Sequence, residues 1–469
     1  MSRYLICLLA IFTPLCALCQ RAEVHLSLDD ALMIARNKNF ALALAREEVI
    51  RAEAESQELN ALWYPTLAIT GEYSHTTTEI AATTTLGEIG GELLGNLAPI
   101  IEASPVIGAV IENIGKSELR LPIVPRNSAE VGAELIWVVF SGGRRIAASR
   151  IAKSLLSVAK DKYSATQDAI IATVTEAYWS VALTREITGV RRSALALHSE
   201  HLRQARRLEE EGMINRAERL IAEVAYDQSA TLLAAAESNQ HVAEEMLSSL
   251  LVVDSLTIIP TTPLSTPHTI PSKEELMELI PTTPAINALR SGRDIASLTL
   301  NAERSRYLPS VALIGHQQLW SSGLDKNIFP RTIISIGLEW TLFDGLAREG
   351  AIARSKSALR SAETRLQKGG MELHTAIEKY YSLLTTSLNE YRSQQTTLSL
   401  AEELLRAQQH AFAEGMATSS DVVEATQRLA EVRLAQFITL YTIDTSLATL
   451  LMLVGNADEL TTFFTPTQQ

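Results

Sequence analysis

Four segments of the chain alternate between apolar and polar positions, and this alternation predicts β-strands with one apolar face. They cover residues 66–74, 129–140, 310–320 and 332–343. The apolar side of the second carries Val131, Ala133, Leu135, Trp137 and Val139, and that of the fourth carries Ile334, Ile336, Leu338, Trp340 and Leu342. Alternating segments of about ten residues with an aromatic residue near one end are typical of strands that face lipid. A half-buried sheet in a soluble protein has the same period, so the pattern leaves both readings open.

Four longer segments have the composition of continuous helices, rich in Ala, Leu, Glu, Arg and Ser. They are predicted over residues 144–211, 216–252, 346–414 and 420–454. Gly212 and Gly415 lie where the first and third of them would end, a common place for glycine. The chain is therefore predicted to form two long helical hairpins, the first of them roughly 100 Å long. One more helix is predicted from Ser27 to Trp63.

The chain repeats itself. A constant offset of 203 residues superposes Phe140 on Phe343 and Gly142 on Gly345, and the match continues through Gly212 and Gly415 without a gap. An offset of 244 aligns the earlier part of each half, including Pro65 with Pro309. The difference, 244 − 203 = 41, is an insertion in the first outer loop, 75–128. Two repeats are predicted, over 20–259 and 272–469, joined by a linker at 260–271.

Charge and composition exclude some functions. The 469 residues include 41 basic and 54 acidic side chains, a net charge of −13, which would repel a nucleic-acid backbone. No catalytic constellation and no cofactor motif is present, so neither an enzyme nor a bound cofactor is expected. The pair His198 and His201 shares a helix face and could hold a soft metal. Without a third ligand at fixed spacing, however, a solvated helix surface is the favoured interpretation and no metal site is expected.

The first 19 residues are predicted to be a secretory signal, with Arg3 in the charged region and cleavage before Gln20. All three cysteines lie within it, and lipid attachment at Cys16 or Cys19 is the alternative. No later stretch is apolar and uncharged for the length of a membrane helix, so any membrane crossing is expected to use strands. Since four strands cannot close a barrel and open edges are not tolerated in lipid, the chain must assemble. Two copies would give eight strands and a filled interior, whereas three would give twelve and a lumen.

Several junctions, in their duplicated order, resemble a known family. They are Leu26–Leu32 in the opening helix, Tyr64-Pro65 and Leu308-Pro309 before strands, Phe140-Ser141-Gly142-Gly143 and Phe343-Asp344-Gly345 after strands, and Glu211-Gly212-Met213 and Glu414-Gly415-Met416 at the hairpin tips. Over essentially the whole chain after the signal, this order resembles the outer membrane efflux proteins, the TolC-like outer membrane factors. The extra length of loop 75–128, with glycines at 87, 91 and 95, is a departure from them, and it is expected to form a compact loop outside the cell.

The resemblance implies a homotrimer with a twelve-stranded barrel in the outer membrane of a Gram-negative cell and a helical barrel projecting through the periplasm. The fold class is therefore mostly α with a membrane β-barrel. The implied function is the exit duct of a tripartite efflux or type I secretion system. Its implied partners are a periplasmic adaptor (membrane fusion) protein and an inner-membrane pump of the resistance-nodulation-division or ABC type. A periplasmic coiled-coil scaffold without transport is the alternative, although a scaffold has no use for four amphipathic strands.

The resemblance also assigns roles to individual residues. Asp421 and Glu424, three residues apart on one helix face, match acidic positions of the family's periplasmic constriction, and Glu218 matches a further tip position; ordinary exposed helix charges are the alternative. The tips Gly212, Met213, Gly415 and Met416 are expected to contact the adaptor, and Trp137 and Trp340 to lie in the aromatic girdle nearer the periplasm. Phe412 and Ala417 depart from the family's closing latch, so Arg216 and Arg219 are candidates for closing the tip instead.

Overall fold

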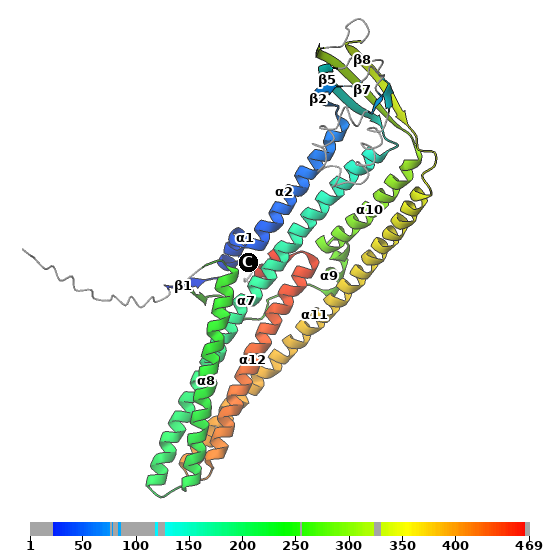
Figure 1. Cartoon of the computed structure of the whole chain (residues 1–469). Helices are drawn as coiled ribbons and strands as arrows, with labels where there is room; N and C mark the ends of the chain where they lie inside the picture. The colour runs from blue at the N-terminus through cyan, green and yellow to red at the C-terminus, as the bar shows by residue number, and fades with distance from the viewer. Residues whose placement is uncertain are drawn as a thin grey trace, which may run out of the picture.

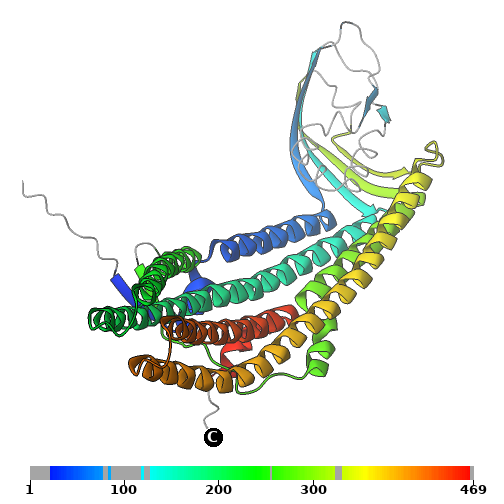
Figure 2. The ribbon, with the colours of Figure 1, turned by 90° about the horizontal axis from the view of Figure 1, so that it is seen from below.

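The computed structural model describes residues 22–75, 77, 83–85, 118–120, 127–253, 256–322 and 330–464. The predicted signal and most of loop 75–128, including its glycines at 87, 91 and 95, lie outside these residues. A bundle of long helices carries a curved sheet at one end, and the turns of both helical hairpins lie at the other (Figures 1 and 2).

The four α-helices described in each half correspond one to one. The first half contains α1 (Leu28–Lys38), α2 (Phe40–Asn60), the 3-10 turn η1 (Ala61–Trp63), α7 (Arg144–Glu210) and α8 (Arg216–Leu250). The second contains α9 (Lys273–Leu279), η2 (Ile280–Thr282), α10 (Pro284–Arg304), η3 (Ser305–Tyr307), α11 (Ala347–Ala413), α12 (Ser419–Val454) and η4 (Ala457–Phe463). The bounds of α2 and α10 differ by 244 at both ends, and those of α7 and α11 by 203, so the predicted repeat is confirmed.

The prediction of one helix from Ser27 to Trp63 is wrong. Asn39 has an extended backbone, with ψ of 128°, and separates α1 from α2. Its backbone N–H donates to Ala35 O and closes α1, while its side-chain oxygen accepts from Ala41 N at 2.8 Å and opens α2. One asparagine thus satisfies backbone groups of both helix ends, which makes the break stable.

The main sheet has four antiparallel strands in the order β2-β5-β7-β8. Their bounds are Thr66–His75, Asn127–Phe140, Ser310–Ser322 and Thr332–Glu339. The last strand ends four residues before the predicted 343. The outer edges of β2 and β8 have no partner strand among the described residues. Loop 75–128 contributes β3 (Thr83–Thr85) and β4 (Glu118–Arg120), which pair in a sheet of their own.

A second pairing was not predicted. Strand β1 (Ala22–Leu26) lies parallel to β6 (Leu256–Pro260), at the border of the predicted linker. The Tyr178 hydroxyl, on a fully buried side chain of α7, fixes the chain next to this pair. It donates to Leu26 O at 2.8 Å and accepts from Thr261 N and Thr262 N at 3.0 and 2.9 Å. The first repeat is thereby tied to the linker in the middle of the helical bundle.

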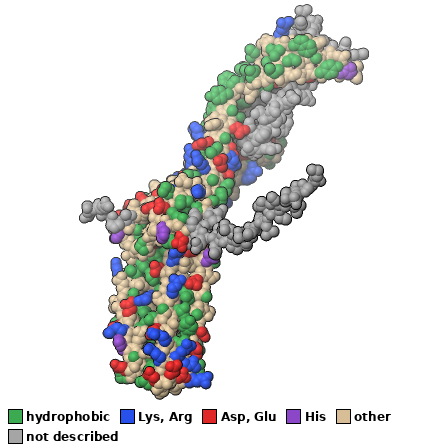
Figure 3. All heavy atoms as spheres, turned by 90° about the vertical axis from the view of Figure 1, so that its left-hand side faces the viewer, with side chains coloured by type: hydrophobic (Ala, Val, Ile, Leu, Met, Phe, Trp, Pro, Cys, Tyr) green, Lys and Arg blue, Asp and Glu red, His purple; other side chains and the backbone are tan. Residues whose placement is uncertain are grey.

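The apolar face of the sheet is exposed in the part of the chain that the structure describes. Ile334, Ile336 and Leu338 of β8 are 72%, 74% and 65% exposed, and Leu67 and Ile69 of β2 are similarly exposed. Figure 3 shows apolar side chains gathered over the sheet end and mixed charges over the opposite end. A soluble half-buried sheet would cover this face, so the alternative reading of the strand pattern loses its support.

One helix of the described chain, α12, has the length and composition to cross a membrane, contrary to the expectation that none would. More than half of its apolar window, 56%, is buried within the chain. Ile443, Leu447 and Leu451 lie in the main core together with Trp179 of α7. The apolar character of α12 is therefore explained by packing inside the helical bundle.

Candidate functional site

The hairpin tips are built on glycine. Gly212 and Gly415 have φ of +72° and +75°, a region that side chains with a Cβ rarely adopt. In each tip the following methionine closes the turn, because Met213 N donates to Leu208 O and Met416 N donates to Ala411 O, both at 2.8 Å. The methionine side chains are exposed by 60% and 72%. Both tips therefore present a flexible apolar side chain at the end of the molecule opposite the sheet.

The predicted gate carboxylates gather around the start of α12, but two of them already have partners. The Asp421 carboxylate accepts from Thr418 N at 2.8 Å and from Thr418 Oγ1 at 2.7 Å, which completes a capping box. These hydrogen bonds hold the pKa of Asp421 below its ordinary value, and the one from the Thr418 backbone N–H has the largest effect. Glu218 of α8 accepts from Ser419 N at 2.7 Å. Glu424 lies one helical turn further and is exposed.

The two hairpins meet at Ser419, a contact that the sequence did not indicate. Ser419 is fully buried, and its hydroxyl lies 3.0 Å from His201 Nε2 of α7. The His201 ring packs edge-on against Phe412 of α11, with ring centroids 4.6 Å apart. Arg219, a candidate for closing the tip, pairs instead with Glu209 at 2.7 Å and with Glu223, within its own hairpin. At the tip, the contacts between the hairpins include those of His201, Phe412 and Glu218.

The prediction of a solvated surface for His198 and His201 is wrong. They are 2% and 4% exposed, because α12 packs on α7 and Phe412 of α11 lies against the His201 ring. The spacing held a usable signal, since His198 lies four and seven residues before Leu202 and Ala205, which are buried on the same face. Among the described residues, no group of three or more His, Cys, Asp or Glu side chains could hold a metal ion.

The buried histidines make the tip sensitive to acid. Burial, together with repulsion from His198, lowers the pKa of His201 to about 4. Because the folded-state pKa lies below the ordinary 6.5, this contribution to tip stability is complete above pH 6.5 and is lost as the pH falls toward 4. We expect amide hydrogen exchange in 197–208 and 419–426, corrected for its intrinsic pH dependence, to accelerate between pH 7 and pH 4.5.

Two variants control this expectation. His201→Gln cannot be protonated in this range and should show a smaller acceleration, whereas His410→Gln, an exposed histidine of α11, should behave as the wild type. An equal acceleration in His201→Gln and the wild type would contradict the assignment.

The predicted girdle residues lie where the sheet joins the helices. The Trp137 indole N–H donates to Trp63 O at 3.1 Å, and that of Trp340 donates to Tyr307 O at 3.0 Å. A guanidinium covers each aromatic ring before the strands, with Arg145 4.2 Å from the Trp63 ring centroid and Arg348 4.6 Å from that of Tyr307. The two junctions are equivalent under the repeat offsets. Each combines an exposed indole with a cation beside the preceding aromatic ring, and the girdle role of Trp137 and Trp340 stays a prediction.

An open-edged sheet with an exposed apolar face is thus joined to two long helical hairpins in the described part of the chain. Residues 277–456 match the family described as outer membrane efflux protein. Protein CyaE of Bordetella pertussis is 28% identical over 260 residues, and the match covers 53% of this chain and 54% of CyaE. The chain thus spans about half the length of this curated relative.

Two solved structures share the fold over nearly the whole chain. The outer membrane protein VceC of Vibrio cholerae has a TM-score of 0.73 at 15% identity, covering 91% of this chain and 96% of VceC. The MtrE outer membrane channel of Neisseria gonorrhoeae has a TM-score of 0.71 at 16% identity, covering 92% of this chain and 89% of MtrE. The family match thus covers part of the second half of the chain, and the two channel structures show the same fold over nearly all of it.

Proposed function

We propose that the protein is a passive exit duct of the outer membrane of a Gram-negative cell. It assembles as a homotrimer, with the sheet end in lipid and the helical hairpins extending through the periplasm. Cargo reaches it from a periplasmic adaptor and an inner-membrane pump, of the resistance-nodulation-division or ABC type, in an efflux or type I secretion system. The observation that carries this proposal is the four-stranded sheet with open edges and an exposed apolar outer face.

The sheet itself supports assembly. Its strands alternate in direction, so the open edges of β2 and β8 run antiparallel and can pair between copies. Unpaired backbone groups are not tolerated in lipid, whereas closure removes both edges. Three copies give twelve strands and leave a lumen, which a duct requires.

Membrane fractionation tests the proposal against the scaffold alternative. A duct is expected in the outer membrane as a trimer that resists detergent and dissociates on heating, and it should conduct ions in a planar bilayer. Recovery as a soluble periplasmic protein without such a trimer would favour the scaffold.

The gate is proposed at Asp421, Glu424 and Glu218, where three copies would crowd carboxylates in the narrowest part of the helical barrel. Such a ring attracts multivalent cations. We expect trivalent cations added on the periplasmic side to block conductance. The block should disappear in Asp421→Ala/Glu424→Ala, and also in Asp421→Asn/Glu424→Gln, which removes the charge and retains side chains able to accept hydrogen bonds.

The second double variant matters because Asp421 also caps α12, so alanine removes a cap as well as a charge. Glu403→Ala serves as the control, since it removes an exposed carboxylate that pairs with Arg406 on α11. A block unchanged in both double variants would mean that the gate lies elsewhere. The exposed Met213 and Met416 are the proposed contacts for the adaptor, because methionine adapts to varied apolar surfaces.

A further inference from the structure

The four strands of the main sheet carry acidic side chains but no lysine or arginine. Their described ranges contain four glutamates, Glu72, Glu130, Glu134 and Glu339. All four lie on the polar face of the sheet, because they alternate with the apolar residues of the same strands. A surface lined by charges of one sign raises the local concentration of ions of the opposite sign. The polar face of the sheet is therefore expected to attract cations.

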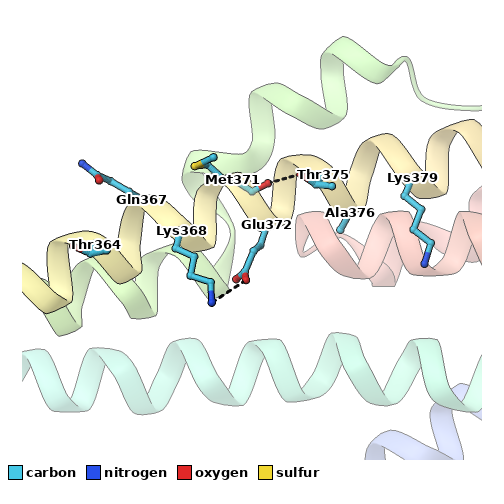
Figure 4. A pocket seen from close by; sticks show the side chains of 8 residues that line it. All are labelled: Thr364, Gln367, Lys368, Met371, Glu372, Thr375, Ala376 and Lys379. Atoms are coloured by element: carbon cyan, nitrogen blue, oxygen red, sulfur yellow. Dashed lines mark hydrogen bonds and ion pairs between the residues drawn. The ribbon is translucent and has the colours of Figure 1, made fainter.

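Charges on the long helix α11 are balanced instead. The Glu372 carboxylate lies 3.4 Å from the Lys368 ammonium, one helical turn away. Figure 4 shows this pair among the side chains that line an open groove on α11. Further along the same helix, Glu403 pairs with Arg406. Positive and negative side chains of this kind offset each other, so the one-sided charge of the sheet is a feature of the sheet itself.

Two of the glutamates face each other across neighbouring strands. Glu72 of β2 is paired in register with Glu130 of β5. Paired residues of antiparallel strands point to the same side of the sheet, and like charges placed directly opposite each other are destabilising. A positive charge nearby would relieve this repulsion. Within the four described strands, the side chain that approaches Glu130 for this purpose is the imidazole of His316.

His316 of β7 occupies the space that a side chain on Gly132 would fill. A Cβ on Gly132 would lie 2.6 Å from His316 Cε1, so only glycine leaves room for the ring. The ring reaches across Gly132 to Glu130, whose Oε1 lies 2.7 Å from His316 Nε2. The side chains of His316 and Glu130 remain 25% and 29% exposed. Together they form the accessible rim of a small cluster on the polar face.

Glu134 forms the floor of this cluster and has an unused hydrogen-bond acceptor. It is paired in register with His316, so both side chains point to the same side of the sheet. Glu134 is only 1% exposed, and its Oε2 has no hydrogen-bond partner among the described residues. A buried polar atom without a partner is costly. The Glu134 carboxylate therefore lacks a hydrogen-bond donor that a ligand could supply.

We propose that Glu72, Glu130, Glu134 and His316 form a cation-binding site on the inner wall of the barrel, which favours the passage of cationic cargo. This inference rests on the proposed duct and names the class of its cargo. A protonated amine entering through the rim would donate the hydrogen bond that Glu134 lacks and would reduce the repulsion between Glu72 and Glu130. A metal ion is not the proposed ligand, because no group of three His, Cys, Asp or Glu side chains in the described chain could hold one.

Ion selectivity of the full chain in a planar bilayer tests this site. Each variant is made in the background Asp421→Asn/Glu424→Gln, so that the proposed tip gate contributes less charge. Across a gradient of methylammonium chloride, the reversal potential of the background channel should show that methylammonium passes in preference to chloride. Glu134→Gln keeps the shape of the side chain without its charge and should lose most of this preference. Glu130→Gln, at the rim, should lose part of it.

Glu339→Gln is the matched control, because it removes one carboxylate from the same face outside the cluster. It should lose less of the preference than Glu134→Gln, and equal losses would mean that the charge is spread over the wall without a site. An unchanged preference in Glu134→Gln would also overturn the site while leaving the duct in place. If Glu134→Gln gave no trimer, an unchanged preference in Glu130→Gln would overturn it. Absence of conductance in the wild type would overturn the proposed function as well.

Discussion

Leu338→Arg is expected to abolish the membrane-inserted trimer. Leu338 is 65% exposed on the apolar face of β8, and arginine on the lipid face near the bilayer centre costs about 2–4 kcal/mol in each of the three chains. The yield of heat-dissociable trimer in the outer membrane fraction is the measurement. Leu135→Arg on β5 should act in the same direction.

Ser335→Arg provides the matched control, because Ser335 lies three residues earlier on the same strand and on its polar face. It should retain the trimer and change conductance instead. If Leu338→Arg assembled as well as Ser335→Arg, the apolar face would not be turned toward lipid.

Gly142→Ala is expected to prevent correct folding of the chain, whereas Gly345→Ala should leave the chain folded. Both glycines have positive φ, +64° and +70°, so alanine at either site costs about 1–2 kcal/mol in backbone strain. Only at Gly142 does the new Cβ also meet backbone of the same chain, 2.6 Å from Ser305 O. Overpacking of this kind adds about 1–3 kcal/mol.

Protease resistance of the detergent-solubilised chain reports on folding, and the trimer fraction reports on assembly. Gly142→Ala should lose both. Gly345→Ala should keep a resistant chain, because nothing in the chain lies within 4 Å of the new Cβ. If the two variants had the same protease resistance and the same trimer fraction, the surroundings of Gly142 and Gly345 would not differ in the way described here.

Much of the fold could be predicted because it depends on local patterns that occur twice. The period of two in 332–343 and the uninterrupted helix formers of 144–211 are set by neighbouring residues, and the offsets 203 and 244 transfer each assignment from one half to the other. Gly212 and Gly415 end their helices for the same local reason. Even the missed break at Asn39 has a local cause in the capping ability of its side chain.

The candidate site was less predictable, because its geometry depends on residues far apart in the chain. The tip positions of Asp421 and Glu218 followed from the repeat, but their hydrogen bonds to Thr418 and Ser419 did not. The charge of Arg219 suggested a closing contact between hairpins, yet its nearest carboxylates lie on its own hairpin.

By itself, the sequence determined the class of protein: strands with one apolar face, helical hairpins, and their duplication. The tertiary structure decided what each surface faces. It buried His198 and His201 beneath the second hairpin, joined β1 to β6 across about half the chain, and left the outer edges of β2 and β8 open among the described residues. Periodicity specifies which residues share a face, whereas only packing between distant segments specifies whether that face meets core, solvent, lipid or another copy.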